Sequence, residues 1–290
     1  MSRVLSKVDA ASGNPARWPA PTKQGLTTVR SGYWQDLTTA DFGRIDAERT
    51  VGLLPVAAVE QHGPHLPLAT DALINEALVR ATLERAPAGA TLLVLPAQNV
   101  GLSPEHTSFA GTLSIRDTTL LDAWTDIGRS VARTGVRKLI VLNTHGGQKT
   151  LVDLLAMRLR SELGMLVVRT TYFAFGALPD LFDPAEVVHD IHGGEVETSL
   201  LLHIKPDLVR TAALADFKGL PHELAARNKL LGAEKPVGIG WRAEDLNPAG
   251  ACGNAARADG RRGAQHLSYL ADRFAALVGE VAATPLTILR

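Results

Sequence analysis

The sequence predicts a single α/β domain of three layers, with helices on both faces of a mainly parallel β-sheet. Two observations support this prediction. Short apolar runs of strand length alternate with segments of helical periodicity, as in a parallel sheet whose strands are joined by helices. Polar residues of ligand or catalytic type follow these apolar runs or open the helices, where open α/β sheets bind ligands. The length of 290 residues suffices for one large domain with a substantial core.

An N-terminal extension is predicted at residues 1–32, ahead of a domain at residues 33–290. The extension is polar and contains three prolines. We therefore expect an arm that is partly disordered or lies on a neighbouring subunit. Residues 33–47 then predict a helix capped by Thr38 or Thr39.

Four apolar runs predict the strands of the sheet, at residues 51–59, 91–97, 137–142 and 165–171. The first run is apolar throughout, which is typical of a strand buried on both faces. Helical patterns are found at residues 72–85, 117–134, 148–163, from 192 onward, and at 262–283. The segment 172–192 is long enough to form a lid, whereas the composition of 216–263 predicts no clear pattern.

A group of metal-type ligands follows the first predicted strand. Glu60 and His62 are alternate residues of an extended chain and point the same way, and Asp71 ends the following loop. Two carboxylates and an imidazole suit a divalent ion such as Zn, Mn or Fe. A solvated strand end at Glu60 and a helix N-cap at Asp71 are the alternatives.

The string EQHGPHLPLATD at residues 60–71 closely resembles the EQHGPHLPLxTD signature of the creatininase (creatinine amidohydrolase) family. Three further segments resemble motifs of that family: GLSPEHTSFAGTLSI at 101–115, NTHGGQ at 143–148 and HGGEVETS at 192–199. A looser resemblance is found in GACGNAARADGRRG at 250–263. The family contains metal-dependent hydrolases, so the resemblance implies such an activity and a creatininase-like fold.

The resemblance implies two divalent metal ions per chain, Zn, Mn or Fe. The expected ligands are Glu60, His62, Asp71, His145 and Glu195. In this assignment Asp71 bridges the ions, Glu60 and His145 complete one site, and His62 and Glu195 complete the other.

Glu195 is assigned as a ligand because this chain differs from creatininase proper at one ligand position. That enzyme has a ligand carboxylate two residues after the histidine that matches His145, where this chain has Gly147. Glu195 lies three residues after His192 and is the expected substitute, although it could be only a capping-box acid. Glu197 lies about 200° farther round the helix and is given an ion-pair role.

Further side chains are expected around the substrate: Ser103, Glu105, His106, Thr144 and Trp241. His106 could also be a ligand or an ordinary loop histidine, Glu105 a helix cap or salt-bridge partner, and Trp241 a packing residue. His192 is the candidate catalytic proton shuttle, because an ordinary pKa of about 6.5 lets an imidazole accept and donate a proton.

The predicted function is hydrolysis of a cyclic or linear amide C–N bond of a small molecule by a metal-bound hydroxide. A peptide-like or formamide substrate and a cyclic polyol ketone or lactone are alternatives. A non-catalytic, metal-stabilised binding protein is the alternative from another class. Residues 150–192 lack the tryptophans that creatininase is expected to place around its substrate, which disfavours creatinine itself.

The composition excludes several other classes. The formal net charge of zero gives no reason to expect nucleic acid or an anionic membrane as partner. No apolar run approaches the roughly 18 residues of a membrane span. Cys252 is the only cysteine, so neither an intrachain disulfide nor a thiolate metal cluster can form, and a cytoplasmic location is expected. The family resemblance implies a homo-oligomer, specifically a homohexamer.

Overall fold

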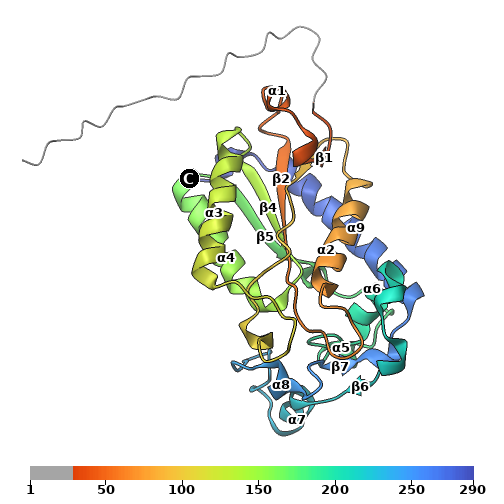
Figure 1. The fold of residues 1–290 in the computed structure, drawn as a ribbon. Helices are drawn as coiled ribbons and strands as arrows, with labels where there is room; N and C mark the ends of the chain where they lie inside the picture. The colour runs from red at the N-terminus through yellow and green to blue at the C-terminus, as the bar shows by residue number, and fades with distance from the viewer. Residues whose placement is uncertain (1–28) are drawn as a thin grey trace, which may run out of the picture.

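The computed structural model describes residues 29–290, so most of the extension predicted at 1–32 lies outside the described residues. Within them, five parallel strands form a sheet of order β1-β3-β2-β4-β5 (Figure 1). The strands are β1 (Gly32–Tyr33), β2 (Thr50–Val56), β3 (Thr91–Val94), β4 (Lys138–Asn143) and β5 (Leu166–Thr171). All four predicted strands are present, with ends that lie within three residues of the predicted ones.

Helices cover both faces of the sheet and confirm the three-layer prediction. One face is covered by α3 (Asp117–Arg133) and α4 (Lys149–Leu163), and the other by α2 (Thr70–Leu83), α6 (Glu195–Ile204) and α9 (Gly260–Ala283) (Figure 1). Every residue of β2 is buried. Leu53 packs in the core under α2 and α9, while Leu54 packs in the core under α3 and α4. Among residues 29–290, no helix has the length and hydropathy needed to cross a bilayer.

A cover of short elements lies beyond the carboxyl ends of the strands (Figure 1). Its two strands, β6 (Asp216–Phe217) and β7 (Gly253–Asn254), pair in antiparallel fashion. The short helices are α5 (Pro184–Val187), α7 (Leu220–Arg227) and α8 (Ala243–Leu246). The segment 216–263, which predicted no clear pattern, therefore forms a folded wall at the end of the sheet where ligands are expected.

The helix predicted at 33–47 is wrong over most of its length. Gly32 and Tyr33 form the edge strand β1, in register with Leu93 and Val94. Only α1 (Thr39–Phe42) is α-helical, with Thr38 at its N-cap position as expected. A pairing partner far along the chain thus overrides a local helical pattern that extends over a single turn.

Asn75 on α2 joins the two strand ends that carry the predicted ligands. Its buried amide donates to the carbonyls of Val56, at 3.1 Å, and Leu142, at 3.3 Å, and lies 3.2 Å from the Thr144 hydroxyl. Val56 ends β2, and Leu142 lies next to the end of β4. One side chain therefore fixes the separation of the two chains just before they leave the sheet.

We expect Asn75→Ala to lower the free energy of unfolding by roughly 2 kcal/mol or more, because it removes the buried hydrogen bonds that the Asn75 amide donates to the two strand ends. Urea unfolding followed by circular dichroism measures this change. Glu76→Ala, at an exposed neighbour on the same helix, is the matched control and should stay within about 0.5 kcal/mol of the wild type. Equal stabilities of the two variants would contradict the role given to Asn75.

Candidate metal centre

The loops after β2 and β4 bring four of the predicted ligands together. His62 Nε2 lies 3.2 Å from Asp71 Oδ1. His145 Nδ1 lies 3.1 Å from Glu60 Oε1 and 3.5 Å from Asp71 Oδ2. All four residues are at most 2% exposed. The parallel strands end at one edge of the sheet, so residues 85 positions apart along the chain meet there.

Main-chain carbonyls orient two of these imidazoles. His62 donates from Nδ1 to the Glu60 carbonyl at 3.0 Å, which turns Nε2 toward the carboxylates. His145 donates from Nε2 to the Leu102 carbonyl at 2.9 Å, which turns Nδ1 toward them. Histidines that bind metals are commonly held in this way by a hydrogen bond from the second ring nitrogen.

The cluster attracts positive charge. Burial alone would lower the pKa of His62, but Asp71, Glu197 and Glu60 together outweigh burial and raise it to about 9. Burial is likewise outweighed at His145, whose pKa is raised well above its usual value by Glu60 and Asp71. Burial would raise the pKa of Glu60, yet His145 and the neighbouring imidazoles lower it. A divalent cation competes with protons for side chains that bind protons this strongly.

The donor atoms fit a divalent ion. Glu60 Oε2 and Asp71 Oδ2 are buried without a hydrogen-bond partner among residues 29–290. Several sets of three possible ligand atoms lie within 4.8 Å of one another: Glu60, His62 and Asp71; Glu60, Glu105 and His145; Glu60, His106 and His192; and His62, His192 and Glu197. Oxygen and imidazole nitrogen donors without a thiolate suit Zn, Mn or Fe.

The expected positions of Glu195 and Glu197 are corrected by the structure. Glu197 faces the cluster, with Oε2 3.9 Å from His62 Nε2, and accepts hydrogen bonds from the Gly193 amide and the Tyr172 hydroxyl. Glu195 points away, to an ion pair with Arg262. The helix begins at Glu195 and not at His192. Glu195 and Glu197 therefore point to opposite faces of the helix, as expected, but each occupies the face that was assigned to the other.

A glutamine amide fixes the proton on His106. Gln61 Oε1 accepts from the Gly63 amide, and Gln61 Nε2 donates to the Gly250 carbonyl, so the orientation of the side-chain amide is set. The same nitrogen lies 2.7 Å from His106 Nδ1, which must therefore accept. His106 then carries its proton on Nε2, 3.3 Å from Glu60 Oε1. The protonated nitrogen of His106 therefore faces the Glu60 carboxylate.

His192 lies at the cavity side of the cluster as a neutral imidazole. Its Nε2 lies 2.6 Å from the Gln61 carbonyl and must donate to it, which leaves Nδ1 as an acceptor 3.9 Å from Glu60 Oε1. The ring stacks between His62 and His106, with centroids 4.1 and 4.3 Å away. Burial, together with these two imidazoles, holds the pKa of His192 well below its usual range.

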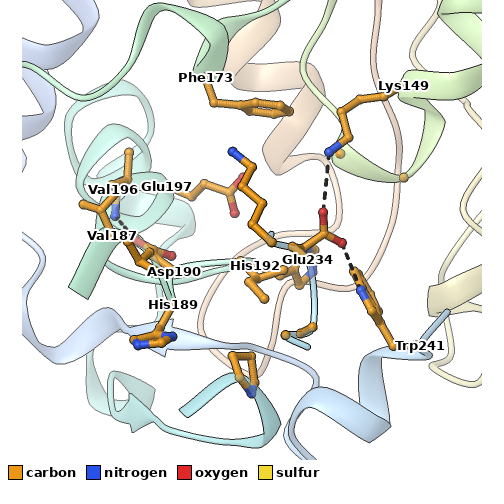
Figure 2. Close-up of a pocket in the computed structure, with 18 of the residues that line it drawn as sticks. Lys149, Phe173, Val187, His189, Asp190, His192, Val196, Glu197, Glu234 and Trp241 are labelled. Atoms are coloured by element: carbon orange, nitrogen blue, oxygen red, sulfur yellow. Dashed lines mark hydrogen bonds and ion pairs between the residues drawn. The ribbon is translucent and has the colours of Figure 1, made fainter. Parts of the chain in front are cut away.

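A cavity of about 750 Å³ lies over the cluster (Figure 2). Three of the residues expected around the substrate line it: Glu105, His106 and Trp241. Ser103 and Thr144 do not. Ser103 is fully buried behind His145, and Thr144 donates to the Asp71 carbonyl at 2.9 Å. Both therefore support the ligands from behind.

The outer wall of the cavity contains residues that the sequence analysis did not identify. Glu234 lies 3.6 Å from Lys149 Nζ and accepts from Trp241 Nε1 at 3.0 Å. Figure 2 shows these three side chains on one side and Val187 and Val196 on the other, with His192 and Glu197 between them. Glu234 lies in segment 216–263, where the sequence has no periodic signal.

The comparisons with known proteins agree with this geometry. Residues 35–278 match the family model Creatininase, described as creatinine amidohydrolase. The mycofactocin precursor peptide peptidase of Mycolicibacterium smegmatis is 37% identical over 164 residues, which are 56% of this chain and 61% of that relative. The match thus spans less than two thirds of the length of that relative. The creatinine amidohydrolase of Pseudomonas putida is 32% identical over 204 residues, covering 64% of this chain and 77% of that relative.

A solved structure of a manganese form of creatininase superposes with a TM-score of 0.67 at 27% identity, covering 87% of this chain and 98% of that one. The parallel sheet and the buried carboxylate–histidine cluster define a three-layer α/β protein with a site of the kind that holds divalent ions. The chain belongs to the creatininase family.

Proposed function

We propose that this chain is a metal-dependent hydrolase that cleaves an amide C–N bond. The observation that carries the proposal is the group of buried carboxylate oxygens without hydrogen-bond partners, which lies with two oriented imidazoles at the floor of the cavity. Two ions would be held by the group, with Asp71 available to both. Glu60 and His145 would bind one ion, and His62 and Glu197 the other.

The protein's own groups suit proton transfer during hydrolysis. Bound divalent ions supply Lewis acidity and lower the pKa of water. His192 Nδ1 is free to take a proton from the attacking water and to return it to the leaving nitrogen. The Gln61 carbonyl holds the other ring proton, so the imidazole keeps the tautomer required for the next cycle. His106 Nε2 lies 3.3 Å from Glu60 Oε1 and places its ring proton beside that carboxylate.

The cavity favours an extended, peptide-like substrate over a small ring. A volume of about 750 Å³ leaves room for several residues of a peptide. Lys229 and Lys235 line it and form no ion pair among residues 29–290, so they are available to a substrate carboxylate. Phe173, Val187 and Val196 offer apolar surface. The peptidase relative supports the same substrate class.

We expect Glu197→Gln to lose one metal ion, because a neutral amide is a poor ligand for a hard ion. Glu195→Gln should retain both ions, since Glu195 contacts Arg262 outside the cluster. Elemental analysis after loading with Zn or Mn and gel filtration measures the stoichiometry of both variants and the wild type. Retention of two ions by Glu197→Gln alongside loss of one by Glu195→Gln would restore the assignment made from the sequence.

The activity itself is tested with Zn- and Mn-loaded protein on short peptides with a free carboxyl terminus, formamides, creatinine, other lactams and lactones. We expect hydrolysis of linear amides, with peptides the better substrates. His192→Gln should lower kcat by about 10²–10⁴-fold and keep both ions, the usual effect of losing a positioned acid–base group. Metal-loaded wild type that hydrolyses none of these amides would favour a binding protein, and turnover of lactones alone would favour the ester-type alternative.

We further propose a homohexamer located in the cytoplasm. Family membership and two exposed apolar side chains on α4, Leu154 and Met157, support an interface. Light scattering should give the mass of six chains, and Met157→Glu should reduce it if α4 lies in the interface. A chain lacking residues 1–28 tests the contribution of the extension. Monomers with and without these residues would refute the assembly.

A further inference from the structure

Glu105 reaches the centre from a different loop, through space that Gly147 leaves open. Glu105 lies in the turn Pro104–His106, and Gly147 lies in the turn Gly146–Gln148 that follows β4. A Cβ atom on Gly147 would clash with Glu105 Oε1 and would lie 2.7 Å from His145 Nε2. The carboxylate of Glu105 therefore occupies the place of a side chain at position 147, beside the His145 ring.

One oxygen of this carboxylate is buried without a hydrogen bond in the described part of the chain. Glu105 is 11% exposed at its side chain, and Oε1 has no hydrogen-bond partner among residues 29–290. His145 Nε2 lies 3.4 Å away, but its proton is donated to the Leu102 carbonyl. Within the same described range no lysine or arginine forms an ion pair with Glu105. Burying a carboxylate in this way is costly unless a cation binds to it.

The neighbouring groups supply the rest of a coordination shell. Three possible ligand atoms lie within 4.8 Å of one another: a carboxylate oxygen of Glu60, a carboxylate oxygen of Glu105 and a ring nitrogen of His145. An ion between them could reach all three after small side-chain movements, since Zn–O and Zn–N bonds are about 2.0–2.2 Å. With Glu105 included, the centre holds the carboxylates Glu60, Asp71, Glu105 and Glu197. Their four negative charges balance two divalent ions.

We propose that Glu105 is a metal ligand that binds the same ion as Glu60 and His145. The proposal rests on the proposed function and completes the ion site that otherwise has only Glu60, Asp71 and His145. A positioning role, in which Glu105 only packs beside the His145 ring and holds it in place, is the competing explanation.

Glu105→Gln and Glu105→Ala separate the two roles. The glutamine side chain keeps the size of glutamate and its place beside the His145 ring but is a poor ligand for a hard ion. A ligand role predicts that both variants lose one ion, or bind it at least about 100-fold more weakly, beyond the 10–100-fold typical of residues that support ligands. A positioning role predicts that Glu105→Gln stays close to wild type while Glu105→Ala does not.

Metal stoichiometry and chelator competition give the affinities, and the visible absorption of Co²⁺-loaded protein reports the coordination of the ion. We expect Glu105→Gln to change this spectrum. Gly147→Ala, which displaces the carboxylate without removing it, should also weaken one ion, whereas Gly146→Ala should retain wild-type affinity because a Cβ there meets no atom within 4 Å. Because a Cβ on Gly147 also crowds the His145 ring, the glycine pair supports the Glu105 variants, and the two Glu105 substitutions decide the role.

The failures of the two proposals are distinguishable. Wild-type protein that binds no metal would overturn the proposed function and the ligand role together. Wild type that binds two ions, with unchanged affinity and an unchanged Co²⁺ spectrum in Glu105→Gln, would overturn the ligand role alone.

Discussion

Hydrogen bonds from imidazoles to main-chain carbonyls are the interaction on which the site depends. His62, His145 and His192 each donate from one ring nitrogen to a carbonyl, those of Glu60, Leu102 and Gln61. A carbonyl can only accept, so each bond fixes the tautomer and turns the other nitrogen toward the buried carboxylates. Because the acceptors belong to the loops themselves, the path of the backbone decides the chemistry of each ring.

Those loops are held by the sheet and by a few buried polar side chains. The parallel register of β2 and β4 pairs Val56 with Asn143, so Glu60 and His145 leave the sheet side by side. Asn75 ties the same strand ends together. His65 lies 2.9 Å from the Gly193 carbonyl and joins the first loop to the start of α6, where the Gly193 amide donates to Glu197. Residues far apart in sequence thus reach one centre through backbone contacts.

The sequence predicted the parts of this arrangement that follow from local pattern. The apolar runs gave the strands, and Glu60, His62, Asp71 and His145 meet as the strand-end argument required. Prediction from the sequence failed for residues whose position depends on the first residue of a helix or on pairing with a distant strand. The start of α6 at Glu195 exchanged the faces given to Glu195 and Glu197, and pairing with β3 made Tyr33 part of a strand. The wall around Glu234 has no periodicity from which it could be predicted.

The partners of each buried carboxylate distinguish structural from ligand roles in this fold. Glu195 is paired with Arg262, with Arg257 3.6 Å away. A guanidinium keeps its charge at any physiological pH, so these pairs leave no place for a metal ion. Glu60 and Asp71 face imidazoles instead, which can give up a proton and then coordinate the incoming ion through the same nitrogen. Glu105 likewise has only an imidazole beside it. The exchangeable proton, more than the number of acidic groups, marks which carboxylates are suited to bind metal.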